Sequence, residues 1–459
     1  MLDHELLPEP VLPAHPEWIE LYWRAWDILS QRMRHGTTQN EFAPDYLDAA
    51  FSENIFQWDT CFIAAFARYG GHVFPVTASL DNFYHKQHAD GFICREIDAA
   101  GQDCWPPNSD QAINPPLFAW AEWLNFQITG DDQRLRDVWS LLDRYYRWIV
   151  AHRMDEGLYH TSNLGSGMDN SPRCGWQWVD LSAQQAHAAK ILAQIAIILG
   201  NIDGATQYRQ EYANLAQRIN ESMWDERDGF YYDTLHRAEH RYGFARCKTL
   251  ATFWPLLAGI VPPQRATQLV EHLQNPNEFN RPHPFPTLSA DHPSYLPTGG
   301  YWLGGVWAPM NYMVIKGLDA NGYSHLGRHF AEQYLTQLAE VAAKTGTLWE
   351  NYAPEFAAPG RPARADFVGW SGLGPIALLI EDVLGITVDA PAQRICWRIR
   401  PGETQGIRRL RMGANIIDLM IEDGQCRVLA ILSFSLILID KNARRELWIA
   451  ANSFTTIQL

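Results

Sequence analysis

Two carboxylates lie in segments that are otherwise rich in aromatic and amide side chains. Asp169 is part of residues 166–173 (SGMDNSPR), and Glu350 follows a tryptophan in residues 349–355 (WENYAPE). Glycoside cleavage needs such a pair, because one carboxyl group protonates the leaving oxygen while the other attacks or activates a water. Aromatic walls stack on sugar faces and raise a carboxyl pKa by excluding water. Asp169 and Glu350 are therefore the candidate catalytic residues.

The 19 tryptophans suggest a surface that stacks on a flat ligand, because a core can be filled with smaller apolar side chains. The candidates for stacking on a sugar ring are Trp58, Trp302, Trp307 and Trp370. The candidates for binding its hydroxyl groups are Gln57, Asp59, Asn114, Asn170, Arg173 and Tyr301. Further candidates for substrate contact in the same segments are Phe56, Gln111, Trp176 and Tyr352.

Several of these residues also have a purely structural interpretation. Residues 169–172 (DNSP) favour a turn, Glu350 could be a solvated loop acid, and Asp59 could interact with the N-terminus of its own helix. His283 and His292 show no metal-ligand spacing, so neither a metal nor an organic cofactor is predicted. Four tryptophans inside helical stripes are assigned to the core: Trp120, Trp123, Trp139 and Trp148.

The elements that must position these residues are mainly α-helical. Helical periodicity recurs in twelve spans: 16–36, 57–69, 74–88, 115–129, 131–153, 181–199, 204–222, 250–259, 262–274, 305–318, 321–344 and 371–384. The middle ten form five pairs with short links inside each pair and long links between pairs, which is typical of antiparallel hairpins. With the first and last spans as a sixth pair, the pattern predicts an (α/α)6 barrel. Its long loops then emerge on one face, over helix N-termini.

The sequence pattern changes near residue 391. We predict that residues 1–390 form the barrel and carry the site. Residues 391–459 alternate between apolar and polar positions or are β-branched, which predicts a small C-terminal β-appendage with a structural role.

Composition excludes some classes of partner. The net charge of −15 argues against nucleic acid or an anionic membrane, because both bind basic surfaces. The N-terminus (MLDHELLPEP) has no secretory signal pattern, and the seven scattered cysteines show no disulfide or metal spacing. We therefore expect free thiols and a cytoplasmic location. The carboxylate pair with its aromatic neighbours, described above, favours a small-molecule carbohydrate as the partner. The sequence leaves open whether the chain forms a homo-oligomer.

Four motifs resemble those of glycoside hydrolase family 63, which includes processing α-glucosidase I and bacterial mannosylglycerate and glucosylglycerate hydrolases. Residues 166–173 resemble its general-acid loop, and Trp58-Asp59 its sugar-binding element. Residues 301–307 (YWLGGVW) resemble its YWRGPxW segment, and residues 350–352 its general-base segment. The resemblance implies an (α/α)6 barrel, inversion at the anomeric carbon and an α-glycoside substrate. It also implies that Asp169 is the general acid and Glu350 the general base.

The chain departs from the family pattern at two positions. Leu303 stands where the family has Arg, and Gly305 where it has Pro, so the preference for the aglycone is expected to differ. The neighbouring trehalase family shares the barrel and a similar acid loop, but Asn170 and Pro172 favour family 63.

The predicted function is an inverting, exo-acting α-glycosidase that hydrolyses a small α-glucoside or α-mannoside. Two alternatives remain open at this point. One is a trehalase-like α-glucosidase. The other is a sugar isomerase or epimerase on the same barrel, a chemistry that usually requires histidine as acid and base.

Overall fold

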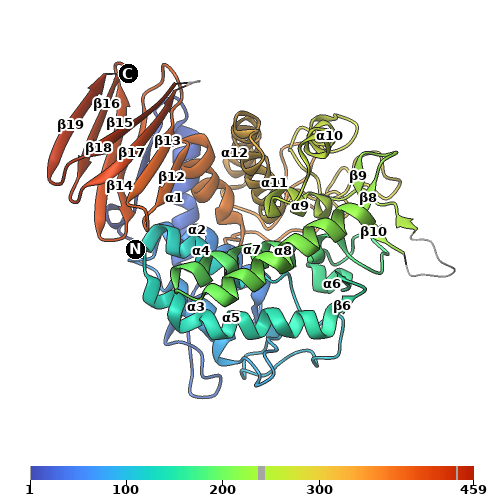
Figure 1. The fold of residues 1–459 in the computed structure, drawn as a ribbon. Helices are drawn as coiled ribbons and strands as arrows, with labels where there is room; N and C mark the ends of the chain where they lie inside the picture. The colour runs from blue at the N-terminus through green and yellow to red at the C-terminus, as the bar shows by residue number, and fades with distance from the viewer. Residues whose placement is uncertain (1, 236–242, 441–442, 459) are drawn as a thin grey trace.

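The helices fall into two classes by burial. The computed structural model describes residues 2–235, 243–440 and 443–458 (Figure 1). Within these residues, six helices are buried on nearly every side because they are apolar around most of their circumference. These are α2 (Gln57–Ala67), α4 (Phe118–Thr129), α7 (Val179–Ile198), α9 (Trp254–Ala258), α11 (Ala308–Ala320) and the π-helix η5 (Gly374–Val383). Each contacts the next, and η5 contacts both α11 and α2, so the six form a closed inner ring.

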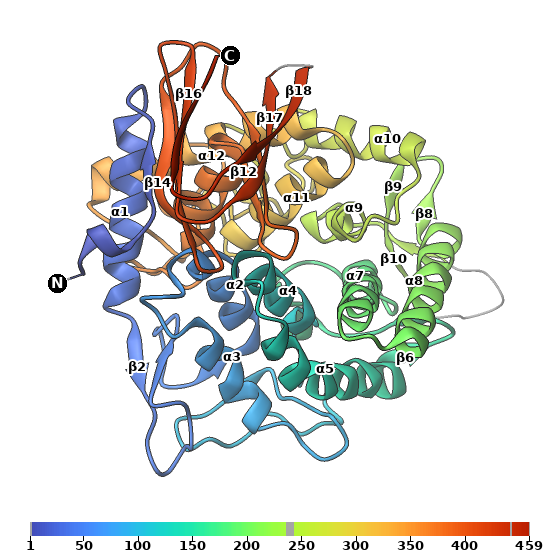
Figure 2. The ribbon, with the colours of Figure 1, turned by 60° about the vertical axis from the view of Figure 1, so that its left-hand side comes forward.

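A second set of helices carries a single apolar face and covers this ring. It consists of α1 (Pro16–Ser30), α3 (Val76–His85), α5 (Asp132–Arg153), α8 (Ile202–Ser222), α10 (Pro263–Gln274) and α12 (Ser324–Thr345). Figure 2 shows α3, α5, α8 and α10 outside α2, α4, α7 and α9, while α1 packs on η5. The predicted (α/α)6 barrel is thereby confirmed.

The alternation of short and long links also matches the prediction. Long segments precede the inner helices α4, α7, α9 and α11 and the 3-10 helix η4 (Ser371–Leu373), which leads into η5. Short elements in these segments are α6 (Asn163–Ser166) and η3 (Leu250–Phe253), together with β6 (Met154–Asp155), β7 (Leu158–Tyr159), β8 (Trp224–Asp225), β9 (Phe230–Tyr231), β10 (Asp233–Thr234) and β11 (Phe244–Ala245). Just before α2, β4 (Ile55–Phe56) pairs with β5 (Glu96–Ile97) of the next loop.

The first helix is shorter than predicted. It ends at Ser30, because the backbone of β2 (Met33–His35) pairs with β3 (Asp45–Leu47) instead of continuing the helix. Near the N-terminus, η1 (His4–Leu6) precedes β1 (Glu9–Val11), and η2 (Arg68–Gly70) follows α2.

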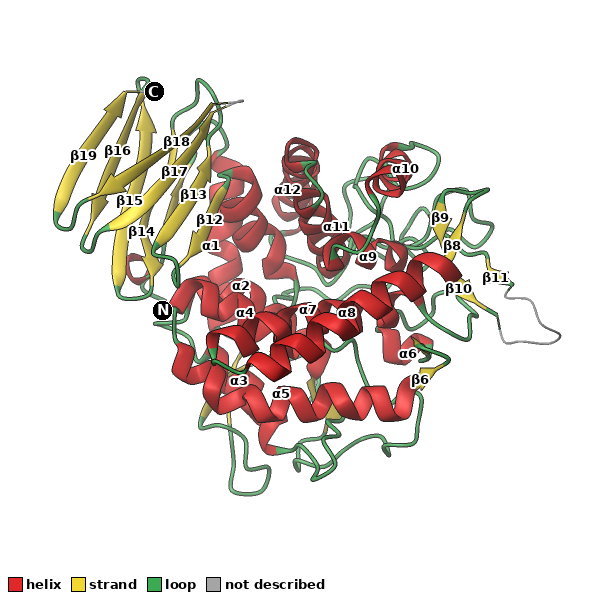
Figure 3. Ribbon diagram, viewed as in Figure 1, coloured by secondary structure: helices red, strands yellow, loops and turns green. Residues whose placement is uncertain are grey.

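The C-terminal strands form two sheets beside the barrel (Figure 3). One has the order β1-β14-β15-β16-β19 and the other β12-β13-β17-β18. Their strands are β12 (Ile386–Asp389), β13 (Arg394–Arg398), β14 (Gln405–Met412), β15 (Asn415–Glu422), β16 (Gln425–Ala430), β17 (Phe434–Asp440), β18 (Ala443–Ile449) and β19 (Ser453–Gln458). Two strands lie outside the predicted appendage of 391–459. β12 begins at Ile386, and β1 from the N-terminus pairs with β14.

The seven cysteines are free thiols, as predicted. None of the helices in the described ranges combines the length and apolar character required to cross a bilayer.

The junction between η4 and α2 leaves no space for a side chain at Gly372. A Cβ there would lie 2.5 Å from the ring of Phe66, which is completely buried on α2. We expect Gly372→Ala to lower the free energy of unfolding by about 1–3 kcal/mol through overpacking. Urea denaturation measures this. Gly327→Ala is the control, because its Cβ would meet nothing closer than 3.4 Å. Equal stability of the two variants would contradict the close packing at η4.

Candidate active site

The long loops converge on a cavity of about 200 Å³ at the N-terminal ends of the inner helices. Nine of the predicted site residues line it: Phe56, Trp58, Asp59, Asn114, Asp169, Tyr301, Trp302, Glu350 and Trp370. They come from the first turn of α2 and from the loops before α2, α4, α7, α11 and η4, as expected for a barrel whose long connections lie on one face. The barrel thus brings both candidate catalytic carboxylates to one cavity.

Asp169 lies at the tip of a tight turn. The backbone N–H of Ser171 donates to the carbonyl of Met168 at 3.0 Å, which closes the turn around Asp169 and Asn170. Before it, Ser162 caps α6, and Gly167 adopts a positive φ of 80° that packs its backbone against the ring of Trp58. The structural interpretation of residues 169–172 as a turn is therefore correct, and the turn is what presents Asp169 to the cavity.

The surroundings of Asp169 favour its protonated form. The residue remains open to solvent at the mouth of the cavity, but the protein around it displaces much of the water that would hydrate the carboxylate. This desolvation raises its pKa to about 6, while the positive charges of Arg95 and Arg364 act in the opposite direction. A carboxyl group with this pKa holds its proton in mildly acidic solution, up to about pH 6, and can donate it to a leaving group.

Glu350 is buried beside an arginine. It is 2% exposed, and Nη1 of Arg364 donates to Oε1 while the backbone N–H of Arg364 donates to Oε2 at 3.2 Å. Burial raises the pKa of Glu350, and the guanidinium of Arg364 counteracts this. Trp370 Nε1 fixes the backbone by donating to the Glu350 carbonyl at 2.9 Å. An arginine-paired carboxylate of this kind is suited to act as a base.

Asp59 is a third carboxyl group in the cavity, on the first turn of α2. It is 4% exposed, and its Oδ1 has no hydrogen-bond partner among the described residues. Burial, reinforced by the negative charges of Asp48 and Glu350, raises its pKa well above the usual value. In its protonated form Asp59 can donate a hydrogen bond to a sugar hydroxyl.

A tryptophan stack forms one wall. Trp302 faces the cavity and stacks on Trp307 with 4.0 Å between ring centroids, and Trp307 Nε1 donates to the carbonyl of Tyr301. A Cβ at Gly305 would lie 2.2 Å from that same carbonyl, so the proline of the family motif does not fit this loop conformation. Leu303, at the position of the family arginine, does not line the cavity.

Asn170 joins two of the loops instead of facing the cavity. Its Nδ2 donates to the carbonyl of Gly300 at 3.0 Å, and its Oδ1 accepts from the backbone N–H of Trp302 at 2.9 Å. The loop of Tyr301 and Trp302 is joined to the Glu350 loop by two backbone hydrogen bonds between Val306 and Tyr352. A side chain predicted to bind hydroxyl groups therefore has its amide engaged in holding the acid loop.

Arg173 lies behind the acid loop, which corrects its predicted role in substrate binding. Its guanidinium forms paired hydrogen bonds with Asp180 and Asp233 at 2.7–2.9 Å and stacks over Trp178. All three charged groups are buried. The arginine anchors the acid loop to the first turn of α7, where Asp180 lies.

Five further predicted contacts also lie outside the cavity lining. Gln57 is buried and bonded to Tyr145, Tyr352 is buried and accepts from the backbone of Trp349, and Trp307 lies behind Trp302. Trp176 is 37% exposed and donates to Asp155, and Gln111 is half-buried outside the lining. Their residue types suggested ligand contact, but the fold directs these side chains to other partners or to the surface.

Two arginines and an aromatic ring of the cavity were not predicted from the sequence. Arg95, Arg364 and Phe51 line the cavity, and the guanidinium of Arg364 lies over the ring of Phe51. Both arginines occur in long loops that precede inner helices. Their basic side chains in those loops are the sequence feature that could have predicted them as cavity residues. Within the described ranges, no group of three or more His, Cys, Asp or Glu side chains is arranged to hold a metal ion.

Known proteins resemble this chain in both sequence and fold. An uncharacterized protein of Borreliella burgdorferi is 29% identical over 391 residues, with 82% of each chain covered. A probable mannosyl-oligosaccharide glucosidase of Schizosaccharomyces pombe is 26% identical over 52% of this chain and 34% of its own length. A trehalase of Oryctolagus cuniculus is 26% identical over 53% of this chain and 46% of its own length. The chain thus spans less than half of the two named enzymes.

The match to the family covers a larger part of this chain than the matches to these two enzymes do. The crystal structure of the GH63 mannosylglycerate hydrolase from Thermus thermophilus in complex with glucose aligns with a TM-score of 0.63 and 20% identity, covering 78% of this chain and 99% of that one. Residues 52–371 match the model of the mannosylglycerate hydrolase MGH1-like glycoside hydrolase domain, and this span includes every residue that lines the catalytic cavity except Phe51. The chain therefore belongs to the MGH1-like glycoside hydrolase family.

Proposed function

We propose that this glycoside hydrolase is an inverting, exo-acting α-glycosidase that cleaves a small α-glucoside or α-mannoside. The observation that carries the proposal is that two carboxyl groups with different charged partners line one cavity. Asp169 is partly desolvated and has a pKa of about 6, whereas Glu350 is paired with Arg364. In this mechanism Asp169 protonates the glycosidic oxygen, and Glu350 takes a proton from the attacking water.

Inversion is inferred from the resemblance to glycoside hydrolase family 63. Inversion requires a separation of about 6.5–9.5 Å, which leaves room for a water, whereas retention requires about 5–5.5 Å. No hydrogen bond joins Asp169 to Glu350 in the described part of the chain. Among the influences on the pKa of Glu350, burial and Arg364 outweigh the charge of Asp169. The charge of Asp169 still contributes to the raised pKa of Glu350, as expected for two carboxyl groups in one cavity.

The cavity size supports a small substrate. Its volume of about 200 Å³ is below the roughly 300–1,000 Å³ of pockets for drug-sized ligands, which favours one sugar ring with a small aglycone. Trp58, Trp302 and Trp370 offer apolar faces for the ring, and Asp59 offers a hydroxyl partner. The glucose bound in the structure of the Thermus relative is consistent with an α-glucoside as the substrate.

The alternatives differ in support. The rabbit trehalase keeps trehalose, itself a small α-glucoside, among the substrates to be tested. An isomerase would require a histidine, but none lines the catalytic cavity in the described residues. His283 is completely buried and bonded to the carbonyl of Ala353 instead.

Proton NMR of a substrate panel tests the proposal. The panel contains trehalose, maltose and the α-glucosyl and α-mannosyl conjugates of D-glycerate. We expect one of them to release its sugar first as the β-anomer, which then equilibrates. Asp169→Asn and Glu350→Gln should each reduce turnover by about 10²–10⁴-fold with the fold retained by circular dichroism. Trehalose is the special case, because its leaving glucose is released as the α-anomer, so inversion then gives equal initial amounts of both anomers. Initial release of the attacked sugar as the α-anomer would contradict inversion, and full activity of either variant would contradict its role.

The pH dependence of kcat/KM tests the role of Asp169. Since the acid must be protonated and its pKa is about 6, activity is present below this pH and is lost as the pH rises through it. The acid limb reflects protonation of Glu350. A kcat/KM that stays constant from about pH 6 to about pH 8 would show that Asp169 does not supply the proton.

Asn170 is expected to act as a positioning residue. Asn170→Asp keeps an acceptor for the N–H of Trp302 but places a negative charge next to Asp169. This charge should raise the pKa of Asp169 and move the alkaline limb up by about half a pH unit or more. Asn214→Asp, on the exposed face of α8, adds the same charge away from the cavity and should leave the limb in place. Identical profiles for the two variants would refute the placement of Asn170.

A further inference from the structure

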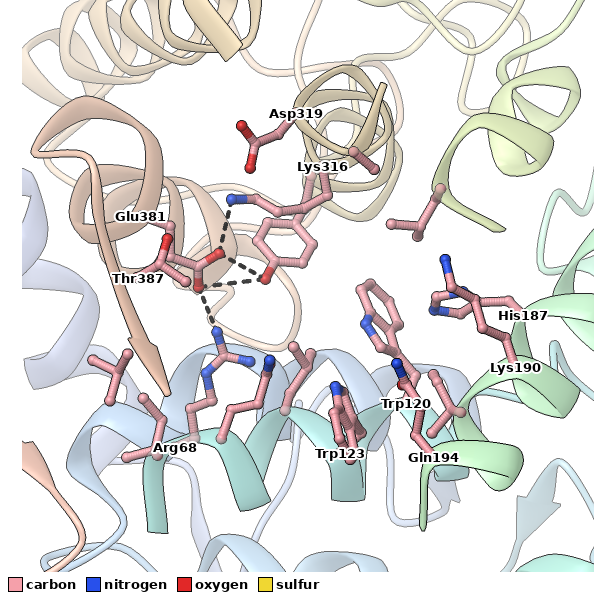
Figure 4. A pocket seen from close by; sticks show the side chains of 18 of the residues that line it. Arg68, Trp120, Trp123, His187, Lys190, Gln194, Lys316, Asp319, Glu381 and Thr387 are labelled. Atoms are coloured by element: carbon pink, nitrogen blue, oxygen red, sulfur yellow. Dashed lines mark hydrogen bonds and ion pairs between the residues drawn. The ribbon is translucent and has the colours of Figure 1, made fainter. Parts of the chain in front are cut away.

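A second cavity lies at the opposite end of the barrel. Its volume is about 330 Å³, and none of its lining residues lines the catalytic cavity. It is formed where the inner helices end, with Arg68 after α2, Trp123 on α4, Lys190 on α7 and Lys316 on α11. Figure 4 shows Lys190 and His187 on one side, Arg68, Lys316 and Glu381 on the other, and the two tryptophans between them. The mechanism proposed above uses none of these groups.

The charges around this cavity leave one cation without a carboxylate. Glu381 pairs with Arg68 at 2.7 Å and with Lys316 at 3.0 Å, and Lys316 also pairs with Asp382 at 2.6 Å. Asp319 pairs with Arg398 outside the lining at 2.9 Å. Lys190 has no ion pair in the described residues, in a protein whose net charge is −15.

Several polar side chains at the cavity also have donors or acceptors that form no hydrogen bond, or only a long one, among the described residues. The only hydrogen bond of Lys190 among the described residues is a long one, 3.4 Å to the carbonyl of Ala258 at the end of α9. His187 is 7% exposed, and neither ring nitrogen has a partner in the described residues. Nε and Nη1 of Arg68 are likewise buried without one. Buried polar groups are normally satisfied, so this concentration of unpaired ring and guanidinium nitrogens is unusual.

The remaining walls suit a hydroxylated ligand. Trp120 and Trp123 provide aromatic faces, and Gln127 and Gln194 also line the cavity, with Gln194 exposed to solvent. The volume falls at the lower end of the range of small-molecule pockets. The acids of the cavity are already paired, so the groups still available are mostly donors, and these favour acceptor-rich ligands.

We propose that this second cavity binds a small hydroxylated anion, either a sugar acid or a sugar phosphate. The anionic group pairs with Lys190 and accepts from the neighbouring donors, while the hydroxyl-bearing part lies against Trp123 and the amide side chains. Burial without a carboxylate lowers the pKa of Lys190, an electrostatic cost that a bound anion removes. A purely structural role for Lys190, as a cap on the end of α9, gives no such binding.

Isothermal titration calorimetry of the full-length protein tests this site. The probes are D-gluconate for a carboxylate, glucose 6-phosphate for a phosphate and glucose as the uncharged comparison. At least one anion should bind at least about 10-fold more tightly than glucose. Lys190→Gln should weaken this binding by about 10-fold or more, because it removes a charge-assisted contact. The anion bound more tightly identifies the head group.

Two further variants establish whether the anion binds at Lys190 or elsewhere on the protein. Lys344→Gln removes the same charge from an exposed position on α12 and should leave anion binding unchanged. Arg364→Gln alters the catalytic cavity and should also leave it unchanged. The proposal is overturned if neither anion binds more tightly than glucose, if Lys190→Gln binds like Lys344→Gln, or if Arg364→Gln alone abolishes binding.

Discussion

The active site depends on hydrogen bonds that join three loops in series. Asn170 ties the acid loop to Gly300 and Trp302, and the backbones of Val306 and Tyr352 tie that loop to the one that carries Glu350. A general acid and a general base must be held in register with a substrate between them. The helices bring the loops to one rim, but these cross-loop bonds set the relative positions of the two carboxyl groups. The buried Arg173 then fixes the acid loop to α7.

Desolvation alone would make the two carboxyl groups alike, since it raises the pKa of both. The difference comes from Arg364, which bonds Glu350 directly but influences Asp169 only through its charge. Because that arginine is itself partly exposed, its position depends on the Glu350 loop and on the ring of Phe51. The different roles of the acid and the base thus depend on the contact between Arg364 and Glu350, two residues of the same loop.

The architecture could be predicted from sequence because its signals are local. Helical periodicity and the alternation of short and long links are properties of neighbouring residues, and they place Asp169 and Glu350 on one rim. Side-chain direction is not local. Gln57 and Trp58 are adjacent in the sequence, yet only Trp58 faces the cavity. Arg173 has the chemistry of a ligand contact, but its charge is neutralised by Asp180 and by Asp233, which comes from a distant loop. The pairing of β1 with β14 joins distant parts of the chain and leaves no local pattern.

Ring closure has a consequence for the biosynthesis of the chain. The inner ring is completed only when η5 packs on α2 and α11, and η5 spans Gly374–Val383. β14 lies between β15 and β1, and β1 leaves the ribosome long before β14. The apolar faces of the early helices that pack on η5 therefore remain uncovered until this last inner helix has been synthesised. Such late, long-range closure makes folding slow, and it gives chaperones a long interval in which to bind the growing chain.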